Sequence, residues 1–299
     1  MAKILISGGS GLIGKALINK LTEDGHDVSI LTRQPLKNNA VKSYFWDIEH
    51  FKIDENAFDG IEHIVHLAGC GIADKKWTHV RKKEIIDSRI KSAKLILSIL
   101  NKRNIKLKSF IGASAVGIYG TRTSQTIFQE SDFSTEDFLS QTCLAWENVY
   151  SKFDYFTEKK VILRLGVVIS KNGGALKKLL PIFQLGLGSA IGSGKQYMPW
   201  IHLDDLVSLI LESLFNRIYR GTYNAVASEH ITNLFFSKQL AMALNKVFIM
   251  PAVPSFILKI IFGERADMLL RGSRVSNKKI LENYFVFKYP DIKSALLMM

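Results

Sequence analysis

The sequence predicts an α/β fold, a Rossmann-type doubly wound parallel sheet with a smaller carboxyl-terminal substrate lobe. Short apolar runs alternate with helical stretches along the first 170 residues or so, which is the order that a parallel sheet requires. A glycine-rich turn joins the first apolar run to the first helical stretch, and the pattern becomes less regular after about Gly173. We therefore expect ligands at the carboxyl ends of the strands.

The elements begin at the N-terminus. The apolar run at residues 3–7 predicts a strand, and the apolar side chains behind it recur at helical spacing: Leu12, Ile13, Ala16, Leu17 and Leu21. Further strands are expected at residues 28–31, 41–46, 61–67 and 110–113, with a long helix over about 77–102.

The second half continues the alternation and then departs from it. Ser134-Thr135-Glu136-Asp137 resembles a capping box and predicts a helix from there to about Phe153, before a strand over residues 161–169. Beyond it, helices are expected near residues 175–185, 203–216, 233–244 and 254–262, and a strand near 221–225. We expect this part to form a lobe that closes over the strand ends.

Composition excludes several classes of protein. With 299 residues, 47% hydrophobic and 22% charged, the chain is neither disordered nor fibrous. Cys70 and Cys143 are too few for a disulfide scaffold or a thiolate metal site, so no metal is expected. The start lacks the order of a secretory signal, and no apolar run approaches the ~20 residues of a membrane span. We expect a cytoplasmic protein without a membrane partner.

Forty Lys and Arg residues against 27 Asp and Glu residues give a net charge of +13. This charge is compatible with nucleic acid, anionic lipid or a phosphorylated small ligand. The lysines are dispersed in pairs rather than gathered in one arm with interleaved aromatic residues. We interpret them as a solvated basic surface and expect no nucleic-acid partner.

Glycines at positions 8, 11 and 14 follow the first strand directly and open the first helix. Without β-carbons the backbone can approach a pyrophosphate, and the free N–H groups at the helix start stabilise its charge. A glycine triplet alone is a weak signal, but the strand, the helix and the chain start agree here. The turn, including Ser10, therefore predicts a dinucleotide site.

The end of the second strand distinguishes NAD from NADP, because a side chain there meets the adenosine ribose. An acidic residue about 20 positions beyond the glycines suits the free hydroxyl of NAD, whereas an arginine suits the phosphate of NADP. Arg33 occupies this window, and Asp27 precedes the strand. We predict NADP(H), the alternative being that Arg33 is only a surface charge.

Several segments together resemble one family. They are SGGSGLIG, HLAG, KKWTHVRKKEIIDSRI, SAVGIYG, CLAWE, LRLGVVIS, GSGKQYMPWIHLDDL, GTYNAVASEHITN and FGERADMLLRGSRV, and they span nearly the whole chain. This pattern is similar to the epimerase-type atypical extended short-chain dehydrogenases/reductases, the YfcH-like group. The resemblance implies an NADP-binding Rossmann domain over residues 1–235 with a lobe-forming segment 173–202 inserted, and a small carboxyl-terminal domain over residues 236–299.

The resemblance also implies roles for single residues. Arg33 would hold the 2′-phosphate and Asp47 would lie near the adenine. The pyrophosphate would be held by Gly8, Ser10, Gly11, Leu12 and Ile13, and the path from adenosine to nicotinamide would be lined by Leu67, Ala68 and Gly69. One departure is Gly69-Cys70-Gly71, where members commonly have a Gly-Glu-Pro-like sequence.

Typical short-chain reductases pair a serine with a Tyr-x-x-x-Lys on the next helix. The tyrosine exchanges a proton with the substrate oxygen, and the lysine lowers the pKa of that tyrosine. Ser114 fits the serine role, but Cys143 and Glu147 occupy the four-residue spacing. A carboxyl group shielded from water can have a raised pKa, so Glu147 is a candidate acid or base.

Other candidates stay open. Tyr155 and Lys159 form a Tyr-x-x-x-Lys that directly precedes the next strand. Tyr119 follows Ser114 at a strand end and is either the proton-exchanging tyrosine or a packing residue. Cys143 is either a buried hydrophobe or a nucleophile. Candidate substrate contacts are Lys195, Gln196 and Tyr197, with Trp200 and His202 as pocket residues before a helix that Asp204 would cap.

Three functions follow. The first is an NADP-dependent oxidoreductase or epimerase-like enzyme that transfers hydride to or from a small polar molecule, sugar-like or nucleotide-like. The second is a redox-sensing module that binds NADP(H), which loss of the Tyr/Lys pair would permit. The third is a nucleic-acid-associated protein. The helices flanking the sheet could also support a homodimer.

Overall fold

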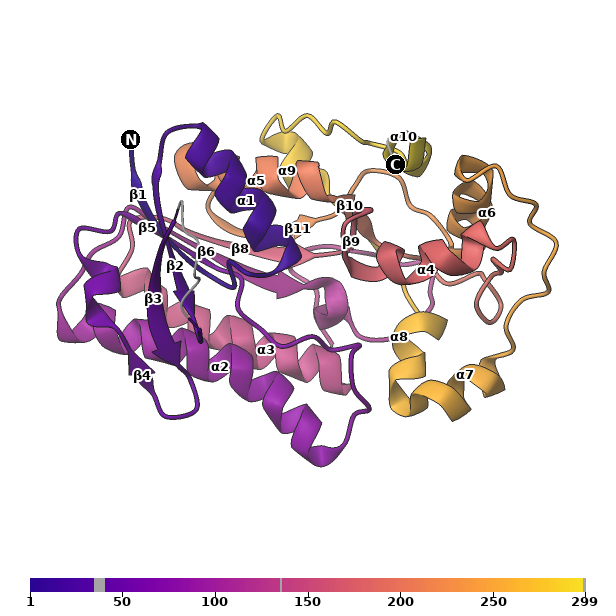
Figure 1. Ribbon diagram of the computed structural model, residues 1–299, viewed down its shortest axis with the longest axis horizontal. Helices are drawn as coiled ribbons and strands as arrows, with labels where there is room; N and C mark the ends of the chain where they lie inside the picture. Colours follow the sequence, from indigo (N-terminus) through magenta and orange to yellow (C-terminus); the bar gives the residue numbers. More distant parts are fainter. Residues whose placement is uncertain (35–40, 135, 298–299) are drawn as a thin grey trace.

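A computed structural model describes residues 1–34, 41–134 and 136–297, and its centre is an eight-stranded sheet (Figure 1). The strand order is β11-β8-β6-β5-β1-β2-β3-β4, and all neighbours are parallel except β3 and β4. The strands are β1 (Lys3–Ser7), β2 (Asp27–Thr32), β3 (Lys42–Asp47), β4 (Lys52–Ile53), β5 (His63–His66), β6 (Ser109–Ala115), β8 (Lys160–Leu165) and β11 (Gly221–Ala225). The predicted doubly wound parallel sheet is confirmed.

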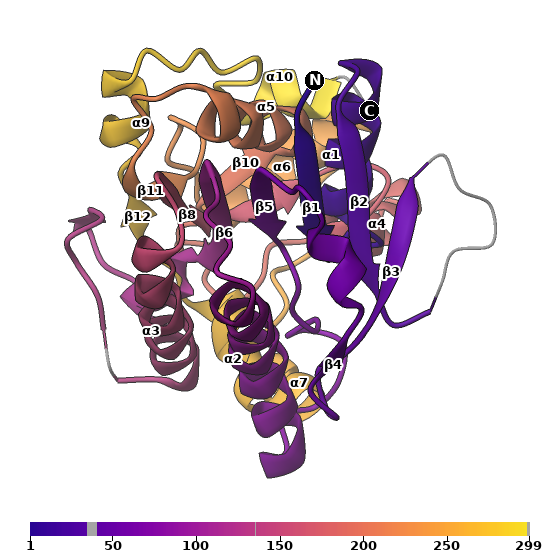
Figure 2. The same cartoon turned by 90° about the vertical axis from the view of Figure 1, so that its left-hand side faces the viewer.

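Helices cover both faces of this sheet (Figure 2). One face packs against the long helix α2 (His79–Lys102) and against α3 (Phe138–Ser151), with Phe110 and Tyr150 in the shared core. The opposite face packs against α1 (Leu12–Glu23) and α5 (Leu203–Phe215). Since apolar side chains of the strands are buried on both sides, their sequences read as continuous apolar runs, as parallel strands do.

The third helix begins later than the sequence predicted. The Asp137 carboxylate accepts a hydrogen bond from the Ser140 N–H at 2.9 Å, and the Ser140 hydroxyl accepts one from the Asp137 N–H at 3.3 Å. This reciprocal pair is the capping box, so the helix starts at Phe138. The proposed box at Ser134 is wrong, because the Asp137 N–H that it would need donates to Ser140, while the Ser134 hydroxyl accepts from the Glu136 N–H. Thr135 lies outside the described residues.

The single strand predicted over residues 161–169 is two strands. β8 ends at Leu165, and β9 (Val167–Ile169) leaves the sheet to pair with β10 (Trp200–His202). Gly166 makes the change of partner possible: a β-carbon there would lie 2.8 Å from the Pro199 carbonyl oxygen. The bend directs the chain from the main sheet into the second lobe.

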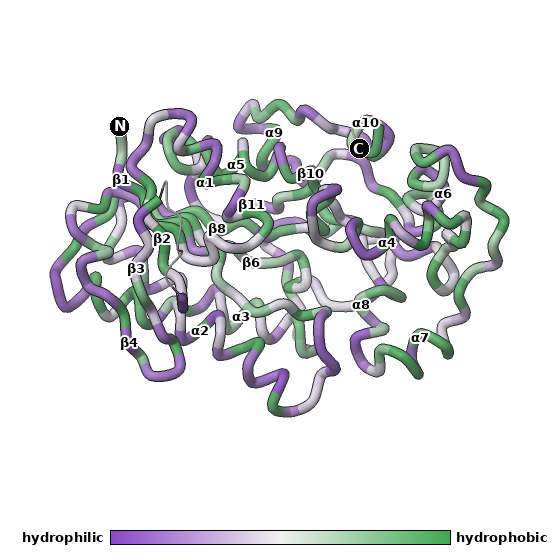
Figure 3. The backbone as a smooth tube through the Cα atoms, in the orientation of Figure 1, coloured by the Kyte–Doolittle hydropathy of each residue, from purple (hydrophilic) through white to green (hydrophobic). Residues whose placement is uncertain are grey.

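The second lobe gathers the carboxyl-terminal helices around its own core, which includes Trp200 and Phe236. Its remaining elements are the helices α4 (Gly174–Gln184), α6 (Asn233–Ala243), α7 (Ser255–Phe262), α8 (Ala266–Leu270) and α10 (Ile292–Leu297), and a strand pair, β7 (Ile127–Phe128) with β12 (Arg274–Val275). Figure 3 shows that α7 is largely hydrophobic. Its side chains Phe256, Ile260 and Ile261 are exposed.

The chain returns to the sheet near its end. The helix α9 (Lys278–Glu282) packs beside β11, and Ile280, Phe285 and Phe287 belong to the core under α1 and α5. The last part of the chain therefore belongs to both lobes. The boundary predicted at residues 235 and 236 stays a prediction.

Candidate active site

The turn after β1 is shaped by its glycines. Gly8 has a φ of +77°, and its carbonyl oxygen accepts a hydrogen bond from the Gly11 N–H at 3.0 Å. A β-carbon on Gly14 would lie 2.4 Å from the Gly8 carbonyl oxygen, so the helix touches the turn directly. Gly11 caps α1 without any side-chain hydrogen bond, which leaves the first N–H groups of the helix available. A pyrophosphate fits this cradle, with Ser10 exposed beside it.

The other predicted cofactor residues lie along the same edge of the sheet. Arg33 is exposed one residue beyond the end of β2, and Asp47 ends β3. Asp47 is bound by His50, whose Nδ1 lies 2.6 Å from Oδ2, and this hydrogen bond lowers the pKa of the Asp47 carboxyl. Leu67, Ala68 and Gly69 follow β5, where the space beside Gly8 is filled by the Leu67 backbone.

A cavity of about 450 Å³ opens where these strands end. Ile13, Leu67 and Gly69 of the expected cofactor path form one side of it. The opposite walls come from β6 and the turn after it, from α3, from the bend after β8, from residues 197–199, and from the segment 268–275 of the second lobe. The cavity is thus continuous with the glycine turn and bounded by both lobes.

One polar chain joins three segments behind this cavity. Ser114, which lines the cavity at the end of β6, donates to Glu147 Oε1 on α3 at 2.6 Å. Arg164 of β8 binds both oxygens of that carboxylate, with Nε to Oε1 at 3.0 Å and Nη2 to Oε2 at 2.9 Å. Both side chains are largely buried. The Glu147 carboxylate therefore has a guanidinium beside it, a partner that the sequence did not predict.

Tyr119 is the next member of this chain. Its hydroxyl donates to Asn224 Oδ1 at 2.5 Å and accepts from Arg164 Nη1 at 3.0 Å. Burial raises the pKa of Tyr119 to about 12 although Arg164 opposes the rise. This phenol already has two partners, which favours the packing interpretation over the catalytic one.

Two other candidates have surroundings that do not suit catalysis. Burial raises the pKa of the Cys143 thiol to about 12, and a protonated buried thiol behaves as a hydrophobe. Tyr155 is 69% exposed, and the ammonium of Lys159 donates to the carbonyl oxygens of Leu214 and Asn216. Since Lys159 precedes β8, this Tyr-x-x-x-Lys lies at the amino end of the strands, away from the cavity.

Among the predicted substrate contacts, only Tyr197 lines the cavity of the described residues. Gln196 is buried and donates to the carbonyl oxygens of Ile191 and Leu269, and Lys195 is exposed. Trp200 lies in the second lobe's core. A pocket role for Trp200 is wrong because its ring is completely buried there.

His202 was predicted to line the pocket, but it caps a helix. Its Nδ1 accepts a hydrogen bond from the Asp204 N–H at 3.2 Å, so His202, and not Asp204, is the N-cap of α5. Its ring packs on Tyr289 with centroids 4.0 Å apart. Burial lowers the pKa of His202, consistent with an uncharged cap.

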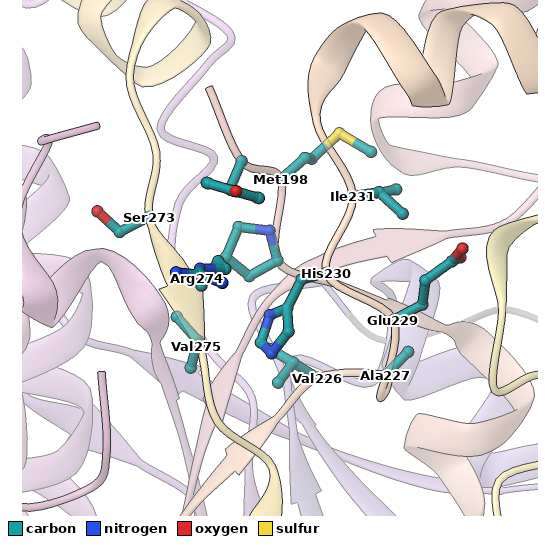
Figure 4. A pocket seen from close by; sticks show the side chains of 11 residues that line it. Met198, Val226, Ala227, Glu229, His230, Ile231, Ser273, Arg274 and Val275 are labelled. Atoms are coloured by element: carbon teal, nitrogen blue, oxygen red, sulfur yellow. The ribbon is translucent and has the colours of Figure 1, made fainter. Parts of the chain in front are cut away.

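A second, much smaller cavity adjoins the first (Figure 4). It has room for about one water molecule, about 10 Å³, and the residues that it shares with the large cavity are Tyr197, Met198, Pro199, Ser273 and Val275. His230 and Arg274 lie close to one another in this view. Its volume is too small for a substrate, so we assign the site to the larger cavity.

Three polar residues of the site were not predicted from the sequence: Arg164, Asn224 and Arg89. Arg164 and Asn224 are polar residues within otherwise apolar strands, and a buried polar side chain is the informative exception in such a strand. Arg89 lies on α2 and lines the cavity. The polar residues within apolar strands were visible in the sequence, but the sequence does not show which side chains Arg164 and Asn224 contact.

Among the described residues, no helix has the length and apolarity to cross a bilayer, and no three His, Cys, Asp or Glu side chains converge as a metal site would require.

Comparisons with known proteins agree with this geometry. Residues 4–225 match the NAD dependent epimerase/dehydratase family, and residues 253–297 match a domain of unknown function. The chain is 35% identical to the chloroplastic Epimerase family protein SDR39U1 homolog of Arabidopsis thaliana, covering 98% of this chain and 85% of the relative. It is 32% identical to Epimerase family protein YfhF of Bacillus subtilis, covering 98% and 96%.

A solved structure is similar over the whole chain. The human epimerase family protein SDR39U1, crystallised with NADPH, superposes with a TM-score of 0.86 at 28% identity, covering 99% of this chain and 98% of that one.

Proposed function

The chain belongs to the NAD dependent epimerase/dehydratase family, in its atypical SDR39U1-like branch, and on that premise we propose that it is an NADP-dependent oxidoreductase or epimerase-like enzyme. The observation that carries the proposal is the cavity that continues from the glycine turn to Ser114. The human relative with NADPH supports the choice of cofactor. When bound, NADP(H) supplies or accepts a hydride.

The turn and the strand ends supply the binding groups. The open backbone at Gly8 and Gly11 and the start of α1 would hold the pyrophosphate. Arg33 would meet the 2′-phosphate, since its guanidinium is exposed at the end of β2. These assignments rest on the shape of the turn and on the position of the strand.

Ser114 and Glu147 would accept the proton of the substrate hydroxyl. Because the Ser114 hydroxyl donates to Glu147, its lone pairs are left to accept a hydrogen bond from a substrate hydroxyl in the cavity. As hydride leaves the substrate carbon, the hydroxyl proton passes to Ser114 Oγ, and the Ser114 proton passes to Glu147 Oε1. Reduction of a carbonyl reverses these transfers. Arg164 orients the carboxylate throughout.

The test combines cofactor binding with turnover. NADPH binding is measured by protein fluorescence, and NADPH oxidation is followed with a panel of carbonyl compounds. Glu147→Gln and Ser114→Ala should each lower turnover by about 10²-fold or more while NADPH affinity stays within about twofold. Glu136→Gln, an exposed glutamate near the start of α3, is the matched control and should leave turnover unchanged.

Two results would contradict the proposal. Unchanged turnover in both Glu147→Gln and Ser114→Ala would remove the proton relay. Tight NADPH binding without oxidation of any carbonyl in the panel would favour the redox-sensing alternative, which the absence of a Tyr/Lys pair beside the described cavity supports.

Three sequence-based expectations stay predictions: a small polar, sugar-like or nucleotide-like substrate, a cytoplasmic location and a homodimer.

A further inference from the structure

The wall of the large cavity has an unusual composition for a site that would bind a sugar. Within the described part of the chain, it contains no Asp, Glu, Asn, Gln, His or Lys side chain. Most of its surface is carbon, from aliphatic, aromatic and methionine side chains such as Ile72, Leu139, Trp146, Val168 and Met268. Its polar side-chain groups are hydroxyls, one thiol, the indole N–H of Trp146 and two guanidinium groups.

Transfer of a polyhydroxylated substrate from water into such a cavity would be unfavourable. Each sugar hydroxyl that leaves water needs a new partner, and an unmatched one costs about 1–3 kcal/mol. Carboxylate and amide side chains usually supply these partners, and the wall offers none among the described residues. An apolar ring or chain, by contrast, binds more favourably in proportion to the apolar area that it buries.

Arg89 is the exception in this wall. Its guanidinium donates from Nη1 to the Ile85 carbonyl oxygen at 2.9 Å and from Nη2 to the Cys70 carbonyl oxygen at 3.3 Å, and it lies 5.0 Å from the centre of the Trp146 ring. Across the described ranges, no carboxylate is paired with it, and burial lowers its pKa.

The second arginine of the wall differs. Arg271 is 52% exposed and has Asp267 at 3.5 Å. The charge of Arg271 is therefore already compensated and hydrated, whereas Arg89 is half-buried and has no carboxylate partner among the described residues. A desolvated cation without a counter-ion stabilises an anion that enters the cavity.

We propose that the substrate is a flat or alicyclic carbonyl compound, or the corresponding alcohol, that carries one carboxylate, with its body against the apolar wall and the carboxylate at Arg89. This inference rests on the proposed function, because the same cavity must present the reacting oxygen to Ser114. One uncompensated guanidinium matches a singly charged anion better than a diphosphate.

The experiment measures binding alone, by isothermal titration calorimetry of the full chain saturated with NADP⁺. The probes are naphthoate, naphthylmethanol, which has the same ring without the charge, and UDP-glucose. Naphthoate should bind at least about tenfold more tightly than either of the others. Arg89→Met should weaken naphthoate at least about tenfold and leave naphthylmethanol within about twofold.

Lys94→Met removes a positive charge from the exposed side of the same helix and should change none of these affinities. Tighter binding of UDP-glucose than of naphthoate would overturn the inference, as would equal binding of naphthoate and naphthylmethanol. A loss of NADPH affinity in Arg89→Met, with naphthoate binding intact, would assign Arg89 to the cofactor and also overturn it. Failure of the unmodified chain to bind NADPH would instead refute the proposed function.

Discussion

The two ends of the site are built in different ways. The glycine turn consists of seven consecutive residues, and its shape follows from contacts of the backbone with itself and with the strand end at Leu67. The Ser114 end brings together side chains from β6, α3, β8 and β11, of which Arg164 and Asn224 come from the later part of the chain. A local backbone geometry can be recognised from sequence alone, whereas an ion pair across a fold cannot.

The difference also concerns charge. The turn carries partial positive charge from free N–H groups, which a bound anion would compensate. The Ser114 end contains a buried carboxylate and a buried guanidinium that need one another. Damage to the turn should therefore weaken NADPH binding, and loss of the Arg164 cation should lower the free energy of unfolding.

The largest effect is expected from Arg164→Met. This change leaves the Glu147 carboxylate buried without its cation and removes a hydrogen bond from Tyr119. Loss of one partner of a buried pair costs about 3–5 kcal/mol of unfolding free energy. Urea unfolding measures it, and Arg164→Met combined with Glu147→Gln should recover part of the loss. A single variant within about 1 kcal/mol of the parent protein would contradict this view of the pair.

Gly14→Ala should come next. The new methyl group would lie 2.4 Å from the Gly8 carbonyl oxygen, so the turn must move. We expect a loss of about 1–3 kcal/mol in stability, as for other overpacked sites, together with loss of NADPH binding. Gly11→Ala is the comparison, since its methyl group meets only the Gly8 oxygen at 3.3 Å. Gly11→Ala should fold normally and bind NADPH more weakly than the unmodified protein. An unchanged NADPH affinity would show that the backbone at Gly11 does not contact the cofactor.

Acid should affect the region beneath the turn. His66 is completely buried, with Nδ1 2.5 Å from the Ser7 hydroxyl and Nε2 3.1 Å from the Ser92 hydroxyl, and burial lowers its pKa to about 3. The native state therefore excludes a proton that the unfolded chain accepts below about pH 6.5. Stability is fully present above that pH and falls toward pH 3.

Between pH 7 and pH 5 the loss attributable to His66 should be about 2 kcal/mol. Denaturant unfolding at both pH values measures it, and His66→Asn should reduce the pH dependence by that amount. The same pH dependence in the variant would assign the effect to other groups.

The smallest effect is expected from Arg33→Ser. The guanidinium is exposed, so the free energy of unfolding should change by less than about 0.5 kcal/mol. NADPH affinity should fall about tenfold and NADH affinity should stay constant, because only the 2′-phosphate loses a partner. Tighter binding of NADH than NADPH by the parent protein would reject Arg33 as the discriminating residue.

The fold was largely predictable from the sequence because strand, turn and helix signals are local. The strand at Gly221–Ala225 and the glycine turn both lie where they were predicted. The start of α3 was not, because the capping box is formed by the contacts of Asp137 with Ser140 and not by Ser134, where it was predicted. The bend at Gly166 was also missed, because the need for glycine arises from Pro199, far along the chain.

The candidate site was predictable only in part. Ser114 and Glu147 were matched to the serine and Tyr-x-x-x-Lys positions of typical short-chain reductases, and they are hydrogen-bonded. The partner that changes the chemistry of Glu147 is Arg164, and no pattern of spacing assigns it. Trp200 and His202 follow a conspicuous glycine-rich segment, but β9 pairs with β10 and turns these residues away from the cavity.

The bend at Gly166 also limits how the cavity can change. The Gly166 N–H donates to the Ala225 carbonyl oxygen, and the Val167 N–H donates to the Pro199 carbonyl oxygen. These hydrogen bonds hold the backbone in place on this side of the cavity. The second lobe contributes Met268 and Arg271 to the cavity wall from a short helix and the residue after it. An engineer who wished to admit a bulkier molecule would therefore leave the strand side alone and vary those two side chains.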